Sequence, residues 1–131
     1  MFDINPSDAA PIWRQIEEGM RRLITLGTLR PGESVPSVRD LARELRVNPA
    51  TVSRAYQRLT DAGVFSVRRG DGTYVADDPV QPKRSERTEM LRDAANRYAS
   101  AAIAVGVELD DAVDELTSSY EKLVHEHRRK A

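Results

Sequence analysis

Two short runs of apolar residues at helical spacing, separated by a tight turn, constrain the fold of this chain more than any other feature. The spacing predicts helices over residues 37–46 and 49–62. Ser37 can cap the first helix, and Asn48 can cap the second. Two short helices joined by such a turn are typical of a helix-turn-helix. Their apolar positions are Val38, Leu41, Ala42, Leu45, Val52, Ala55, Tyr56 and Leu59.

The next segment changes from the period of a helix to the period of a strand. Apolar and polar residues alternate on both sides of a glycine-rich turn at residues 69–72, which predicts a β-hairpin. A helix-turn-helix followed by a hairpin is a winged helix, so we expect a mainly α fold with a small β-hairpin wing. The alternating residues of one hairpin face are Phe65, Val67, Thr73 and Val75.

A further helix is expected before this motif, over residues 8–26. Ser7 or Asp8 can cap it, and Gly27 suits the position just after its end. Residues 29–35 then pass through a Pro-Gly turn and are expected to be extended or irregular.

A polar stretch with two prolines, residues 77–83, indicates a linker. It divides the chain into a winged helix-turn-helix domain, residues 1–78, and a helical tail, residues 79–131. The tail is expected to contain one helix over residues 84–105 and a second helix capped by Asp110 or Asp111.

Each tail helix carries an apolar stripe with steps of three and four, similar to a short coiled-coil seam. Two helices alone bury too little apolar surface to be stable, so they need the first domain or a second copy of themselves. We expect the tail to form a homodimer. The expected dimerisation residues are Leu91, Ala95, Tyr98, Ala102, Val113, Leu116, Tyr120 and Leu123.

The distribution of charge matters more than the net charge of −1, which excludes only a uniformly basic protein of the histone type. Residues 36–72 hold seven arginines and four acidic residues, a local net charge of +3. Pairing of Arg39 or Arg43 with Asp40 or Glu44 would absorb part of this excess. The arginines left over, which favour a phosphate partner, are Arg54, Arg68 and Arg69.

The outer face of the second predicted helix of the motif begins with small side chains and continues with Arg54 and Gln57. Small residues let a helix enter the major groove of DNA, and Arg and Gln can reach base edges or phosphates. An ordinary solvated face would have the same composition, so this helix alone leaves both interpretations open. At the hairpin tip, Gly70 and Gly72 would let Arg69 approach a narrow groove.

Four segments resemble the GntR family of bacterial transcription regulators, and together they cover about residues 10–76. The short helical tail is similar to that of the YtrA-type subfamily, whereas other subfamilies carry larger domains. The four segments are residues 11–16 (PIWRQI), 29–42 (LRPGESVPSVRDLA), 47–56 (VNPATVSRAY) and 70–75 (GDGTYV).

The resemblance implies that Arg39 contacts DNA, that the start of the second motif helix faces the major groove, and that the wing meets the minor groove. Some family members have arginines where this chain has Pro49 and Ser53, so base readout should depend more on Arg39 and Arg54. The expected DNA-binding residues are Ser37, Arg39, Asn48, Ala50, Thr51, Ser53, Arg54, Gln57, Arg69, Gly70 and Gly72.

The function that we expect is a dimeric, sequence-specific regulator of transcription that binds double-stranded DNA. Repression from a palindromic operator, with transporter genes as candidate targets, fits the YtrA-type resemblance. Two alternatives remain. One is a sensor that binds a small-molecule effector of unknown identity between tail and head, in a site lined by Tyr98 and Tyr120. The other is a protein-interaction module that acts through its tail.

Other classes of function have little support. The chain has no cysteine, which excludes disulfides, cysteine-ligated zinc, iron–sulfur clusters and thiol catalysis. His125 and His127 lie two apart, so they face different sides of a helix, and only Glu121 has the spacing to join His125 at a metal. We expect no metal, no cofactor, no enzymatic activity and no membrane partner, and a cytoplasmic location.

Overall fold

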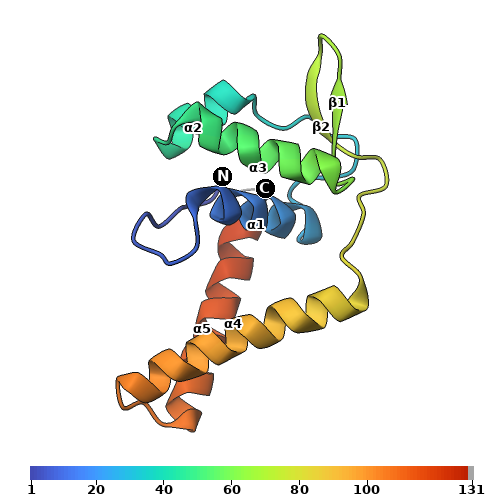
Figure 1. The fold of residues 1–131 in the computed structure, drawn as a ribbon. Helices are drawn as coiled ribbons and strands as arrows, with labels where there is room; N and C mark the ends of the chain where they lie inside the picture. The colour runs from blue at the N-terminus through green and yellow to red at the C-terminus, as the bar shows by residue number, and fades with distance from the viewer. Residues whose placement is uncertain (130–131) are drawn as a thin grey trace. The chain divides into compact units, whose positions relative to one another are not determined.

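The computed structural model describes residues 1–129, which form five helices and one two-stranded hairpin (Figure 1). The expected mainly α fold with a small β-hairpin wing is confirmed. Two compact units are present: Met1–Val80 together with the end of α5 from His127, and Gln81–Glu126. The elements are α1 (Ile12–Thr25), α2 (Val38–Leu45), α3 (Pro49–Asp61), β1 (Phe65–Arg68), β2 (Gly72–Val75), α4 (Arg84–Ala104) and α5 (Leu109–Arg129).

Local capping fixes the turn between α2 and α3. The Ser37 hydroxyl accepts a hydrogen bond from the Asp40 amide at 3.0 Å, and the Asn48 side-chain oxygen accepts one from the Ala50 amide at 2.9 Å. Arg46 closes α2 in the left-handed conformation, with φ of 58° and ψ of 49°. Each cap satisfies a backbone group that the end of a helix leaves without a partner.

The core of the first unit forms where α3 packs on α1 and α2. The apolar stripe of α3 is buried, and Tyr56 meets the Phe65 ring edge-on at a centroid distance of 5.1 Å. Burial of these aliphatic side chains supplies the main stabilising free energy of the unit. The fully buried side chains include Ile16, Met20, Leu23, Leu41, Val52, Leu59 and Val75.

The hairpin pairs Phe65 with Val75 and Arg68 with Gly72, and it projects beyond α3 (Figure 1). The segment before α2, expected to be extended or irregular, pairs with the edge of the hairpin through one isolated β-bridge. Ser34 forms a bridge with Tyr74, and backbone hydrogen bonds of 2.8–3.0 Å flank that bridge. The wing is therefore tied to the segment that leads into α2.

Two helix starts differ from the sequence-based expectation. The first helix begins at Ile12 rather than at Asp8, whose carboxylate instead accepts from the Ala10 amide within a turn. A proline disfavours the helical conformation of the residue before it, so the helix cannot readily extend back past Pro11, which is the N-cap of α1. Asp110 and Asp111 do not precede α5 as caps but lie in its first turn, where their charges favour the helix dipole.

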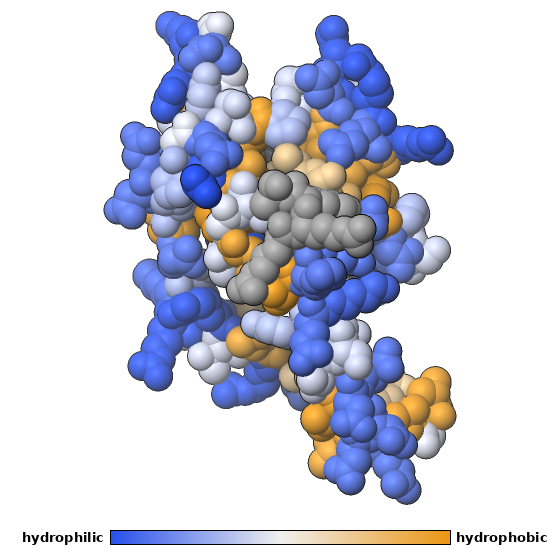
Figure 2. Space-filling view, turned by 180° about the vertical axis from the view of Figure 1, so that it is seen from behind, coloured by the Kyte–Doolittle hydropathy of each residue, from blue (hydrophilic) through white to orange (hydrophobic). Residues whose placement is uncertain are grey.

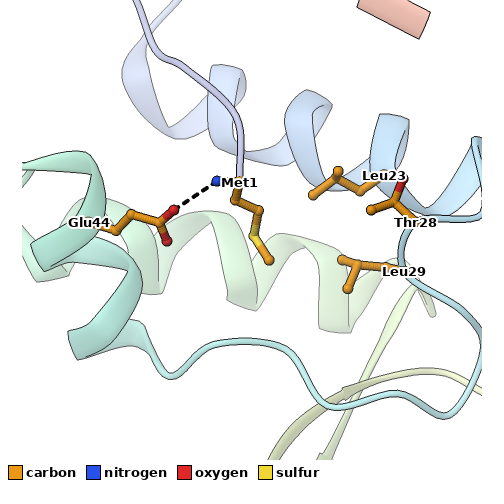
Figure 3. Close-up of a pocket in the computed structure, with 5 residues that line it drawn as sticks. All are labelled: Met1, Leu23, Thr28, Leu29 and Glu44. Atoms are coloured by element: carbon orange, nitrogen blue, oxygen red, sulfur yellow. Dashed lines mark hydrogen bonds and ion pairs between the residues drawn. The ribbon is translucent and has the colours of Figure 1, made fainter. Parts of the chain in front are cut away.

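The N-terminal segment joins the core, which the sequence pattern did not predict. Phe2 is buried against Gly19, where a Cβ would lie only 2.7 Å from the Phe2 ring. The Met1 ammonium forms an ion pair with Glu44 at 2.8 Å (Figure 3). The segment thereby contacts both α1 and α2.

The second unit buries almost nothing by itself. Among residues 81–126 only Ala112 is buried, and the Tyr98 hydroxyl donates to its carbonyl oxygen at 2.7 Å where α4 and α5 meet. Eleven of the thirteen exposed large apolar side chains in the described chain belong to this unit, and Figure 2 shows some of them in orange at the lower right. Within residues 1–129, no helix is both long and apolar enough to cross a bilayer.

Replacing Arg46 with glycine should stabilise the protein. The left-handed conformation costs a residue with a Cβ about 1–2 kcal/mol, while glycine loses about 0.5–1 kcal/mol more entropy on folding. We expect Arg46→Gly to raise the free energy of unfolding by about 0.5–1 kcal/mol in urea denaturation. Arg46→Ala, which removes the charge but keeps the Cβ, is the control and should give no such gain.

Candidate nucleic-acid interface

Arg39 stands in the first turn of α2, two residues after the Ser37 cap, and its side chain is exposed. The neighbouring carboxylates have other partners: Asp40 pairs with Arg43 at 3.7 Å, and Glu44 pairs with the Met1 ammonium at 2.8 Å. Within residues 1–129, Arg39 therefore makes no ion pair. Its charge is available to an anionic partner, and the pairing of Arg39 with Asp40 or Glu44 considered above does not occur.

The outer face of α3 lies opposite its buried stripe and starts with exposed Ala50 and Ser53. Gln57 is also exposed, but its amide donates to Asp61 at 2.8 Å, so it would have to exchange this partner to reach a base. Of the eleven residues expected to contact DNA, ten are exposed and Thr51 is half-buried.

Arg54 extends from α3 toward α1 and stacks on Trp13, with its guanidinium carbon 4.6 Å from the ring centroid. Arg58 stacks on the same ring at 4.5 Å and also donates to Glu17 at 3.0 Å. Trp13 and its neighbour Arg14 were not expected to belong to the site. No local pattern could have revealed them, because their partners on α3 lie about forty residues away in the sequence.

Two neighbouring arginines at the wing tip have different surroundings. Arg68 stacks on the Tyr74 ring at 3.9 Å, and the Tyr74 hydroxyl donates to Asp71 at 2.9 Å. This hydrogen bond to the carboxylate is the main reason why the pKa of Tyr74 is raised. Arg69 is exposed at the tip, beside Gly70 at φ of 77°. Arg68 is thus held along the strand, while Arg69 projects from the turn.

Tyr56 connects the two helices of the motif. Its hydroxyl donates to the Pro36 carbonyl oxygen at 2.7 Å, one residue before the Ser37 cap. Burial, and next the charge of Glu44, raises the pKa of Tyr56. This hydrogen bond fixes the start of α2, and with it Arg39, relative to α3.

The two tyrosines considered for an effector site have different surroundings. The Tyr98 hydroxyl is engaged within the tail, and Tyr120 is 69% exposed. A cavity of about 500 Å³ lies in the first unit, with the ion pair between Met1 and Glu44 at one side and Leu23, Thr28 and Leu29 at the other (Figure 3). In the described part of the chain, no group of three residues could hold a metal ion. The cavity is lined by Met1, Leu23, Thr28, Leu29 and Glu44.

Comparison with known proteins identifies this arrangement. The family model described as "Bacterial regulatory proteins, gntR family" matches residues 13–75. The HTH-type transcriptional repressor YtrA of Bacillus subtilis is 34% identical over 110 residues, which are 84% of this chain and 85% of that protein. The chain belongs to the GntR family, in its YtrA-type branch.

Solved structures agree with this assignment. YtrA from Sulfolobus acidocaldarius, described as a GntR-family transcription factor, matches with a TM-score of 0.55 and 31% identity over 92% of this chain and 97% of its own. AraR(DBD) in complex with operator ORX1 matches with a TM-score of 0.51 and 26% identity over 58% of this chain and 93% of its own. The GntR segment, residues 13–75, contains Trp13 and every residue expected to contact DNA.

Tyr56→Phe tests the connection between α2 and α3. Loss of the hydroxyl leaves the Pro36 carbonyl without this donor, so unfolding at pH 7 should become easier by about 1 kcal/mol. Because the folded state raises the Tyr56 pKa, its contribution is complete below the unfolded value of about 10 and is lost as the pH rises above it. Urea denaturation at pH 7 and pH 10.5 should therefore show a smaller difference between wild type and variant at the higher pH. A difference that grows with pH would contradict the assignment.

Proposed function

We propose that this GntR-family protein is a homodimeric, sequence-specific DNA-binding regulator that represses transcription from a palindromic operator in the cytoplasm. The observation that carries the proposal is Arg39: an exposed guanidinium at the start of α2, with its neighbouring carboxylates already paired, beside the open face of α3. Arginine is the side chain that most often reads guanine in the major groove. Two such heads on one operator would supply the specificity that one small head lacks.

The two parts of the chain would divide the work. Residues 1–78 would read DNA through α2, α3 and the wing, and residues 79–131 would form the dimer. The operator complex of the AraR DNA-binding domain supports the role of the first part, and the name of the Bacillus subtilis relative supports repression. Transporter genes are the regulated targets that we propose to examine first, by inspecting the genes adjacent to this one.

The exposed apolar side chains of α4 and α5 support a second copy of this chain as the occupant of the tail surface. Leu116 is 53% exposed and Tyr120 is 69% exposed, and both belong to the stripe with coiled-coil spacing. Contiguous apolar surface of this kind marks an interface in soluble proteins. A symmetric pairing would bury the same stripe on both copies, as in most homo-oligomers.

Arg39 and Arg69 should have different effects on DNA binding. An operator duplex would first be selected from a random DNA pool, and binding compared with a shuffled duplex at 50 and 200 mM salt. Arg39→Ala should cost about 1–3 kcal/mol on the operator and relax the preference at one position per half-site. Arg69→Ala should weaken both duplexes equally and reduce the slope of log affinity against log salt by about 0.9 for each phosphate that is no longer neutralised. Arg97→Ala, which removes an exposed arginine outside the proposed DNA-binding and dimerisation residues, is the matched control.

Either of two results would refute this assignment. Equal losses on operator and shuffled DNA for Arg39→Ala would remove its role in base readout. A lower melting temperature with unchanged sequence preference would make Arg39 a structural residue only.

The tail surface can be tested in the full chain. Leu116→Glu combined with Tyr120→Glu would place four carboxylates in a paired seam, so the protein should sediment as a monomer at micromolar concentration and bind the operator more weakly. Thr117→Glu, at an exposed neighbour outside the stripe, adds one of these two charges per chain and should leave the dimer intact. A doubly substituted protein that remains dimeric would show that the seam lies elsewhere.

A further inference from the structure

Trp13 is the only tryptophan of the chain, and three guanidinium groups surround it. The half-buried ring packs against the core of the first unit. The guanidinium carbons of Arg58, Arg54 and Arg14 lie 4.5, 4.6 and 5.5 Å from its centroid. Such distances are within the range of cation–π attraction.

Only one of these three arginines is neutralised. Arg58 forms an ion pair with Glu17 at 3.0 Å. Arg54 and Arg14 make no ion pair within residues 1–129, and both are exposed. Arg54 and Arg58 lie four residues apart on α3, where like charges repel each other. The indole ring and Glu17 offset this repulsion and hold two unneutralised guanidinium groups at the surface.

The position of these groups relative to the outer face of α3 suggests their partner. A helix is about 10–12 Å wide with its side chains, and the major groove is about 12 Å wide, so the flanks of an inserted helix face the phosphate backbones. α1 packs on α3, and Arg54 shares the outer face with Ala50, four residues before it, while its guanidinium lies over Trp13 of α1, at the side of that face. A group on this flank meets the edge of the groove rather than its floor.

We propose that Trp13 is a positioning residue for DNA binding, whose ring holds Arg54 against α1 so that Arg54, together with Arg14, contacts a backbone phosphate rather than a base. The proposal rests on the DNA-binding function proposed above and assigns a different role to Arg54 from the base readout expected from the sequence. Stacking fixes the guanidinium plane and leaves its N–H edge free, which suits a phosphate oxygen.

The test uses the full chain and the operator and shuffled duplexes described above. Arg54→Ala should weaken both duplexes equally and lower the salt slope by about 0.9 per protomer. Two protomers would then reduce the change in affinity between 50 and 200 mM salt by about twelvefold. Trp13→Leu keeps an apolar contact with the core but removes the ring, and it should lower the slope similarly. Trp13→Phe keeps an aromatic face and should retain most of the slope.

A matched control and a second readout separate positioning from simple structural support. Arg58→Ala removes the stacked arginine that Glu17 already neutralises, and it should leave the slope unchanged. In the Arg54→Ala background, Trp13→Leu should lower the slope no further if Trp13 acts through Arg54. Acrylamide quenching of Trp13 fluorescence in the free protein should increase in Arg54→Ala, because the guanidinium no longer covers the ring.

Several results would overturn the inference. An unchanged salt slope in Arg54→Ala would exclude a phosphate contact, and a loss confined to the operator would return Arg54 to base readout. This variant alters an exposed side chain, so its result decides the proposal even if Trp13→Leu fails to fold. A further fall in slope when Trp13→Leu is added to Arg54→Ala would show that Trp13 acts independently. A wild-type chain that binds neither duplex would instead refute the DNA-binding function itself.

Discussion

The burial of one face of α3 is the interaction on which the rest of the first unit depends. Val52, Ala55 and Leu59 have no exposed surface, and α1 and α2 both pack on this helix. Residues on opposite faces of a helix have a fixed angular relation, so burying this stripe turns Ala50 and Ser53 toward solvent. The core therefore sets the orientation of the face that we propose enters DNA, and the Tyr56 hydroxyl carries that orientation to the start of α2.

The electrostatics of the interface depend on which carboxylates have partners more than on the net charge of −1. Glu17, Asp40 and Glu44 are near the candidate interface, and each forms an ion pair. These exposed or half-exposed pairs add little stability. Their larger effect is to determine which positive charges remain available. Within residues 1–129, the interface arginines without an ion pair are Arg14, Arg39, Arg54, Arg68 and Arg69.

The sequence predicted what short-range physics controls. The caps at Ser37 and Asn48 act over two or three residues, so the motif helices were found close to their observed bounds. The hairpin followed from its alternation and glycines. Trp13 and Phe2 escaped prediction because their contacts depend on how distant segments pack, and the ion pair between Arg58 and Glu17 spans 41 residues. The predicted start of α1 at residue 8 was wrong because Pro11 disfavours the helical conformation of the residue before it.

The two units differ in how completely they bury their apolar side chains. The first unit buries its apolar stripes within one chain, whereas Ala112 is the only buried residue of Gln81–Glu126. Helices of 21 residues with so little burial gain stability mainly from packing against another surface. If that surface is a second copy, association would order the tail and bring two reading heads to one operator together. Tail folding and dimerisation would then be coupled, so the fraction of paired heads would rise with protein concentration. DNA binding would therefore depend on protein concentration more steeply than binding by a single head.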